Sequence, residues 1–193
     1  MEENQLKNTC ELLLIGGSAG SLEVLFKLLP LLRAGLGFPV VLVLHRRNSA
    51  DSSLSDLLAS KTPNPTREVE DKDPVIPGTI YLAPADYHLL IEHERTFSLD
   101  YSEKIHFSRP SIDVTFESAA EVYGSRLVAI LLSGANEDGS EGLAAVKQAG
   151  GITAVQNPDT AQMPFMPHYA MTHLHVDYVF DTIQMASFIN ELE

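Results

Sequence analysis

Residue types that together carry out nucleophilic catalysis follow apolar runs in this chain. Ser18 lies in the stretch 16–20, Gly-Gly-Ser-Ala-Gly, directly after the apolar run 12–15, and this stretch fits a G-x-S-x-G pattern. In that pattern a sharp strand-to-helix turn lifts the serine hydroxyl out of the backbone, and nearby N–H groups can face an oxyanion. Ser18 is therefore a candidate nucleophile. An anion-binding turn and a purely structural turn are the alternatives for the same residues.

Two nucleotide-binding patterns fit this turn less well. A dinucleotide site has the pattern G-x-G-x-x-G, but Ser18 and Ser21 stand where its second and third glycines belong. A phosphate-binding loop has Gly-Lys-Ser/Thr, and no lysine follows this turn. We therefore expect no nucleotide and no other cofactor.

A candidate base and a candidate acid follow two later apolar runs. His45 ends the run 38–44, and Asp138 lies shortly after the run 126–132. An imidazole accepts a proton near neutral pH, and a carboxylate on its other nitrogen fixes the tautomer. Plainer interpretations exist for both: His45 could bond only to a backbone carbonyl, and Asp138 could cap a helix that begins at Ser140.

The other histidines offer rival bases and a weak metal signal. These histidines are His88, His93, His106, His168, His173 and His175. None of them ends a long apolar run, as His45 does. The pair His173-x-His175 lacks an acidic or cysteine partner at the usual ligand spacing, so we expect no metal site.

Strands and helices are expected to alternate around these residues. Apolar runs predict buried strands over 12–15, 38–44 and 126–132, and shorter strands over 152–155 and 176–180. Helical spacing predicts helices over 22–32, capped by Ser21, and over 51–60, 112–123, 140–149 and from Thr182 onward, with a loop over 157–167. This alternation indicates an α/β fold with a doubly wound, mainly parallel sheet.

The middle of the chain has a different pattern. Residues 66–108 alternate short β-like segments with turns, and Glu92–Arg95 would be the tip of a hairpin, so we expect an antiparallel excursion at one sheet edge. In a parallel sheet the carboxyl ends of the strands share one edge, where ligands bind. Ser18, His45 and Asp138 should therefore meet there.

The totals describe one acidic globular domain. The chain has 193 residues, of which 45% are hydrophobic and 20% are charged, enough for a sizeable core. Its formal net charge of −13 disfavours nucleic acid and anionic membranes as partners, because both require basic side chains. No apolar stretch is long enough to span a bilayer, and the acidic N-terminus is unlike a secretory signal. With Cys10 as the single cysteine, we expect a cytoplasmic protein without membrane insertion.

Several short blocks are more specific together than any one of them. They are Ile15–Gly20, Val43–His45, Gly78–Pro84, Arg109–Asp113, Leu132–Gly134 with Glu137–Gly139, and Asn157–Ala161 with Met166-Pro167. In content and order they resemble the catalytic domain of the chemotaxis protein-glutamate methylesterases, the CheB family. The resemblance runs from about Glu11 to the C-terminus.

The resemblance implies a reaction and a role for each candidate residue. Family members hydrolyse γ-glutamyl methyl esters on the cytoplasmic helices of chemoreceptors, release methanol, and many also deamidate receptor glutamines. Ser18 would be the nucleophile, His45 the base and Asp138 the orienting acid. The oxyanion site and its wall would lie at Ala19, Ala135 and Met166.

Four positions depart from the family pattern. Family members usually have a hydroxyl residue and a second glycine where this chain has Ala19 and Ser21, and Met-Gly where it has Ala135-Asn136. A backbone N–H survives a change of side chain, so the resemblance implies reduced or altered activity rather than none. Losing one oxyanion donor outright would cost on the order of a hundredfold in rate.

The resemblance also sets the expected organisation and partners. Typical members carry an N-terminal receiver domain, whereas we expect only a tail over 1–10 and a catalytic domain over 11–193. The implied partners are chemoreceptor helices, with a separate receiver or methyltransferase protein as a further candidate. A catalytically weakened receptor-binding module and a small-molecule serine esterase are the competing functions. The esterase fits less well, because α/β-hydrolases order their triad Ser, acid, His.

Overall fold

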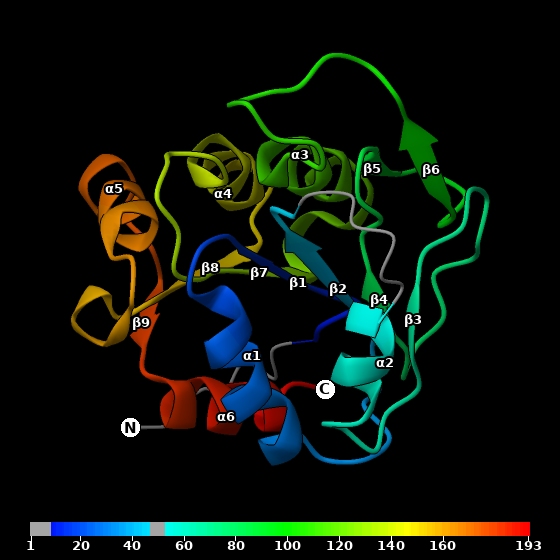
Figure 1. Cartoon of the computed structure of the whole chain (residues 1–193), viewed down its shortest axis with the longest axis horizontal. Coiled ribbons are helices and arrows are strands. Elements are labelled where there is room, and N and C mark those ends of the chain that lie inside the picture. Colours follow the sequence, from blue (N-terminus) through cyan, green and yellow to red (C-terminus); the bar gives the residue numbers. More distant parts are fainter. Residues whose placement is uncertain (1–8, 47–52) are drawn as a thin grey trace, which may run out of the picture.

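A parallel sheet of seven strands forms the centre of the molecule (Figure 1). The computed structural model describes residues 9–46 and 53–193. The strands are β1 (Leu12–Gly17), β2 (Val40–Leu44), β3 (Thr66–Glu68), β4 (Ile80–Leu82), β7 (Leu127–Leu131), β8 (Ile152–Gln156) and β9 (Tyr178–Phe180). Their order is β3-β4-β2-β1-β7-β8-β9, and all neighbours are parallel.

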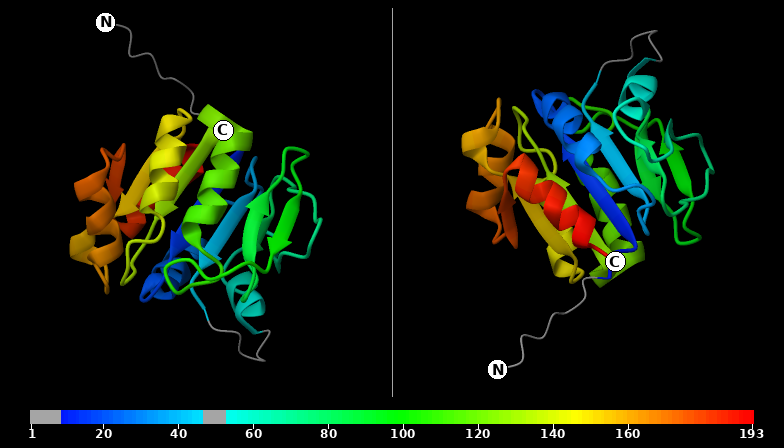
Figure 2. Two further views of the ribbon diagram at one scale, coloured as in Figure 1. Left: turned by 90° about the horizontal axis from the view of Figure 1, so that it is seen from above. Right: turned by 90° about the horizontal axis from the view of Figure 1, so that it is seen from below.

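Helices cover both faces of this sheet, which confirms the doubly wound α/β fold (Figure 1, Figure 2). One face is covered by α1 (Ser21–Leu28), α2 (Ser53–Ala59) and α6 (Thr182–Glu191), and the other by α3 (Ile112–Tyr123), α4 (Ser140–Gln148) and α5 (Phe165–His173). Short 3₁₀ turns occupy Leu29–Leu31, Gly124–Arg126 and Pro158–Thr160. Within the described ranges, no helix is long and apolar enough to cross a bilayer.

The continuous apolar runs are explained by these two layers. Successive side chains of a strand point to opposite faces. In β1, Leu12 and Leu14 therefore lie in the core beneath α3 and α4, while Leu13 and Ile15 lie in the core beneath α1 and α6. A strand covered on both faces needs apolar residues at every position.

The predicted hairpin is present, but it does not extend an edge of the large sheet. Strands β5 (His88–Ile91) and β6 (Phe97–Asp100) form a separate antiparallel pair. Helix α3 takes the place of a further strand beside β5: Thr115 Oγ1 donates to the Leu89 carbonyl at 2.8 Å, and the Ile91 N–H donates to Ser118 Oγ at 3.1 Å. The edge strand of the large sheet on this side is β3, which the sequence pattern did not single out.

Other boundaries differ from the sequence predictions for local reasons. The predicted helix 22–32 ends as the 3₁₀ turn around Pro30, which has no N–H to donate. Helix α5 begins inside the segment predicted as the loop 157–167. Residues 1–8 of the expected tail 1–10 and the start of the predicted helix 51–60, at 51–52, lie outside the described residues. Cys10, expected in the tail, belongs to the folded domain, since it is buried and its N–H donates to the Glu193 carbonyl at 2.7 Å.

Candidate active site

Ser18 and His45 directly follow two neighbouring strands. The register of β1 and β2 pairs Gly17 with Leu44, and the His45 N–H continues this pairing by donating to the Gly17 carbonyl at 3.1 Å. On the other side of β1, the Ser18 N–H donates to the Ser133 carbonyl at 2.9 Å. Since neighbouring strands lie about 4.8 Å apart, Ser18 and His45 are adjacent at the carboxyl edge of the sheet.

The turn that carries Ser18 is held from two sides. Ser21 Oγ donates to the Ser18 carbonyl at 2.6 Å, and Ser133 Oγ donates to the Ala19 carbonyl at 2.7 Å. Gly20 is left-handed at φ 83°, and a Cβ there would lie 2.7 Å from Ser133 Oγ. The prediction that Ser21 caps α1 is wrong, because Gly20 is the N-cap residue and the Ser21 hydroxyl turns back to Ser18 instead.

His45 and Asp138 form a short, buried hydrogen bond. His45 Nε2 lies 2.6 Å from Asp138 Oδ2, and the exposed fractions of the two side chains are 9% and 0%. Because Nε2 faces the carboxylate, Nδ1 is the ring nitrogen available to the hydroxyl of Ser18. In this arrangement Ser18 is partly exposed, and its Oγ makes no hydrogen bond to another described residue.

Asp138 is held by the N-terminus of α3. Its two oxygens also accept hydrogen bonds from Ser111 Oγ at 2.9 Å and from the N–H groups of Ile112 and Asp113 at 2.7 and 3.0 Å. Burial opposes ionisation of Asp138, but the hydrogen bonds from His45 and the backbone outweigh it and lower the pKa of this carboxyl to about 2. Asp138 is therefore an anion, and the alternative that it caps the helix beginning at Ser140 is wrong, because α4 has Gly139 as its N-cap residue.

Asp113 is a second buried carboxylate that the sequence analysis did not place in the site, although it stands in one of the family blocks. Its Oδ1 accepts hydrogen bonds from the N–H groups of Gly139 and Gly142 at 2.9 and 2.7 Å. Burial, followed by the charge of neighbouring Asp138, raises the pKa of the Asp113 carboxyl to about 7. Asp113 thus fixes the loop that carries Asp138.

The residues expected around an oxyanion separate into two groups. Ala19 and Ala135 are exposed beside Ser18 and Gly134, and their N–H groups donate to no other group in the described chain. Met166, expected at the site wall, is instead completely buried. It packs on Gly134, where a Cβ would lie 2.4 Å from Met166 Cε, so it supports the loop from beneath.

A rival base and a possible ligand cluster are explained by their contacts. His88 is buried, accepts from the Ser111 N–H at Nδ1 (3.1 Å) and lies 2.8 Å from the Glu103 carbonyl through Nε2, so both nitrogens are used. His106, Asp113 and Asp138 offer ligand atoms within 4.8 Å of one another. Both oxygens of Asp138 already accept two hydrogen bonds each, which a metal ion would have to displace.

Comparison with known proteins points to one family. A family model described as CheB methylesterase matches residues 13–189. The crystal structure of the catalytic domain of the Thermotoga maritima CheB methylesterase superimposes with a TM-score of 0.90 at 32% identity, covering 95% of this chain and 98% of that one.

Two relatives match this chain, one along nearly the whole of its own length and one along about half of its own length. A Leptospira interrogans protein, to which both methylesterase and glutaminase activities are assigned provisionally, is 40% identical over 95% of each chain. The Thermotoga maritima protein-glutamate methylesterase/protein-glutamine glutaminase is 32% identical, and the match spans 94% of this chain but 54% of that protein. The chain belongs to the CheB methylesterase family.

Proposed function

We propose that this chain is a protein-glutamate methylesterase, which hydrolyses γ-glutamyl methyl esters on chemoreceptors and releases methanol. The hydrogen bond of 2.6 Å between His45 and Asp138, beside Ser18 at the sheet edge, is the observation that carries the proposal. The names of the relatives state the same activity for those proteins. The partner would be the cytoplasmic helices of a chemoreceptor, and the reaction would take place in the cytoplasm.

The chemistry follows from the orientation of the imidazole. Ser18 Oγ attacks the ester carbonyl carbon while His45 Nδ1 takes the hydroxyl proton, and the anionic Asp138 stabilises the imidazolium. The tetrahedral intermediate then breaks its bond to the methoxy oxygen, which leaves as methanol with the proton from His45. Water, deprotonated by His45, attacks the acyl-enzyme, restores Ser18 and leaves a glutamate carboxylate.

The oxyanion would be bound by backbone groups. Ala19 follows Ser18 directly, and Ala135 lies two residues after Ser133, whose carbonyl accepts from the Ser18 N–H; the free N–H groups of both alanines could donate to the developing charge. A main-chain donor does not depend on its side chain, so the departures at these two positions would change the rate but not the reaction. This favours an enzyme over a receptor-binding module that has lost turnover.

Receptor glutamines are proposed as second substrates. The names of the relatives include protein-glutamine glutaminase. The same attack by Ser18 on a glutamine side chain would break a C–N bond, and the proton held by His45 would leave with ammonia. The deacylation step would be identical, since both substrates give the same glutamyl acyl-enzyme.

Mass spectrometry of a methylated chemoreceptor fragment tests the proposal. We expect the wild-type protein to remove methyl groups and Ser18→Ala to remove none. Ser125→Ala is the matched control, because Ser125 is exposed and precedes β7 at the opposite end of the sheet. Equal loss of methyl groups with Ser18→Ala would exclude Ser18 as the nucleophile. No loss with any variant, from a fragment that a known methylesterase demethylates, would exclude the reaction.

A further inference from the structure

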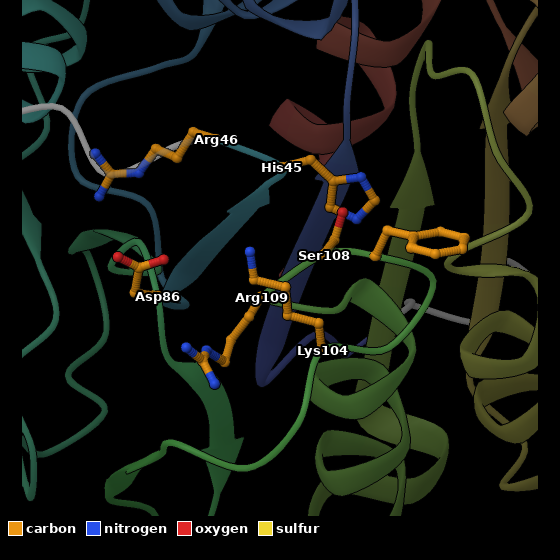
Figure 3. Close-up of a pocket in the computed structure, with 7 residues that line it drawn as sticks. His45, Arg46, Asp86, Lys104, Ser108 and Arg109 are labelled. Atoms are coloured by element: carbon orange, nitrogen blue, oxygen red, sulfur yellow. The ribbon is translucent and has the colours of Figure 1, made fainter.

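A pocket with a concentration of basic side chains adjoins His45. Its volume is about 680 Å³, and its charged lining residues are Arg46, Asp86, Lys104 and Arg109. In Figure 3 the charged ends of these four side chains gather to one side of His45. The chain has 13 lysines and arginines against 26 acidic residues, so three cations in the pocket beside the candidate base contrast with the rest of the molecule.

The charges of this pocket are only partly balanced. Arg46 forms an ion pair with Glu68. In the described part of the chain, no carboxylate lies within 4.0 Å of the charged groups of Lys104 and Arg109. No cationic group lies within 4.0 Å of the Asp86 carboxylate there either. Lys104 and Arg109 together carry two positive charges, and Asp86 carries one negative charge. One positive charge of the pocket is therefore left unbalanced, so the pocket could accept a group with a single negative charge. A doubly charged group such as a phosphate would be opposed by Asp86.

Arg109 is fixed by neighbouring groups but keeps N–H groups that donate to no described residue. Its guanidinium lies 3.8 Å from the ring centroid of Tyr101, and its Nη1 donates to the carbonyls of Tyr101 and Ser102 at 3.3 and 2.5 Å. Its Nη2 donates to no group in the described chain. A guanidinium fixed in this way can offer an N–H to a carboxylate without losing much side-chain freedom.

Lys104 lies between two anchored neighbours. The carbonyl of Glu103 is 2.8 Å from Nε2 of the buried His88. On the other side, Ile105 and Ser108 exchange backbone hydrogen bonds of 3.1 and 2.9 Å across a tight turn. Because both flanking backbones are held, the Cα of Lys104 is fixed beside the pocket, and its exposed side chain contributes to the pocket lining.

We propose that this pocket binds a carboxylate side chain of the same receptor segment that presents the ester to Ser18. The inference rests on the proposed function and adds a substrate preference to it. A protein that carries glutamyl esters also carries the unesterified glutamates that hydrolysis leaves. A single carboxylate matches the charge that Lys104 and Arg109 leave uncompensated, and its planar oxygens match the guanidinium. The pocket thus favours esters that lie near a free glutamate.

Paired peptides test this preference through binding and turnover. Each peptide carries one γ-glutamyl methyl ester flanked by either Glu or Gln, and binding to the Ser18→Ala protein is measured by fluorescence anisotropy. We expect the Glu peptide to bind roughly threefold to fivefold more tightly at low ionic strength, with the difference lost in high salt. Wild-type kcat/KM should show the same preference.

Three variants in the Ser18→Ala background locate the effect. Lys104→Gln should abolish the preference for the Glu peptide, and Asp86→Asn, which removes the opposing charge, should increase it. Lys61→Gln is the control, because Lys61 is an exposed lysine outside the pocket, and it should leave the preference unchanged. Equal binding of both peptides, or a preference that survives Lys104→Gln, overturns the pocket assignment. A preference that depends on Lys104 but is accompanied by no ester hydrolysis in the wild-type protein supports the pocket and refutes the proposed function alone.

Discussion

Asp138 caps α3, which contains Asp113, and Asp113 caps α4, which begins just after Asp138. Asp138 lies directly before α4 but accepts from the first N–H groups of α3, and Asp113 lies in the first turn of α3 but accepts from the Gly139 and Gly142 N–H groups at the start of α4. A helix N-terminus carries partial positive charge and unsatisfied N–H groups. The exchange therefore fixes the two helices to each other and holds Asp138 ionised against His45.

Asp138→Asn should lower turnover by about 10⁴-fold without unfolding the protein, because the amide keeps one acceptor oxygen of similar shape but, being uncharged, no longer stabilises the imidazolium. Methanol release from a methylated receptor fragment measures the effect, and circular dichroism checks the fold. Asp159→Asn, at an exposed acidic residue on the 3₁₀ turn after β8, is the control. Activity of Asp138→Asn close to that of the control would remove Asp138 from the triad.

Asp113→Asn should change how stability depends on pH. A carboxyl whose pKa rises from 3.8 to about 7 on folding binds more protons in the folded state, so its contribution falls as pH rises through that interval. Between about pH 4.5 and pH 8, the wild-type free energy of unfolding should fall relative to that of Asp113→Asn. Asp138 acts in the opposite direction, but only below that range, since its pKa is lowered to about 2.

Urea unfolding at several pH values gives this comparison. Asp113→Ala also removes the acceptor for the Gly139 and Gly142 N–H groups, so it should be less stable than Asp113→Asn at every pH. Parallel pH profiles for the wild type and Asp113→Asn would show that Asp113 is not protonated in the folded protein near neutral pH.

Gly20→Ala should reduce both stability and turnover. The left-handed backbone alone costs an alanine about 1–2 kcal/mol, and the added Cβ would also collide with Ser133 Oγ at 2.7 Å. Gly35→Ala is a matched control, because Gly35 has φ 69° but nothing within 4 Å of its added Cβ. We expect Gly35→Ala to lose stability in thermal unfolding with unchanged kcat. Equal kcat for both variants would show that the serine turn tolerates displacement.

Met166→Ala should destabilise the protein by about 2–5 kcal/mol and lower kcat, whereas Met166→Leu should stay close to the wild type. Met166 is completely buried against Gly134, and a cavity there would release the loop that presents the Ala135 N–H. Denaturant unfolding and methanol release test the two effects. A normal kcat in a destabilised Met166→Ala protein would separate this packing from oxyanion binding.

The sequence by itself determined the main parallel strands and the position of Ser18 and His45. Leu12–Ile15 is apolar at every position because the strand is covered on both faces, and glycines mark its end because the turn needs a left-handed residue at Gly20. These signals are local, so they can be read from neighbouring residues. The convergence of the strand ends at one edge then follows from parallel pairing.

Only the tertiary structure decided which groups satisfy Asp138 and which nitrogen of His45 is left for Ser18. Capping between α3 and α4 joins residues 25 to 29 positions apart, and no periodicity records such a contact. The same holds for the hairpin, whose strand β5 is completed by hydroxyls of α3, and for the pocket that unites Arg46 with Lys104 and Arg109. These relationships depend on how packed elements face one another, because their energy comes from contacts between segments rather than within them.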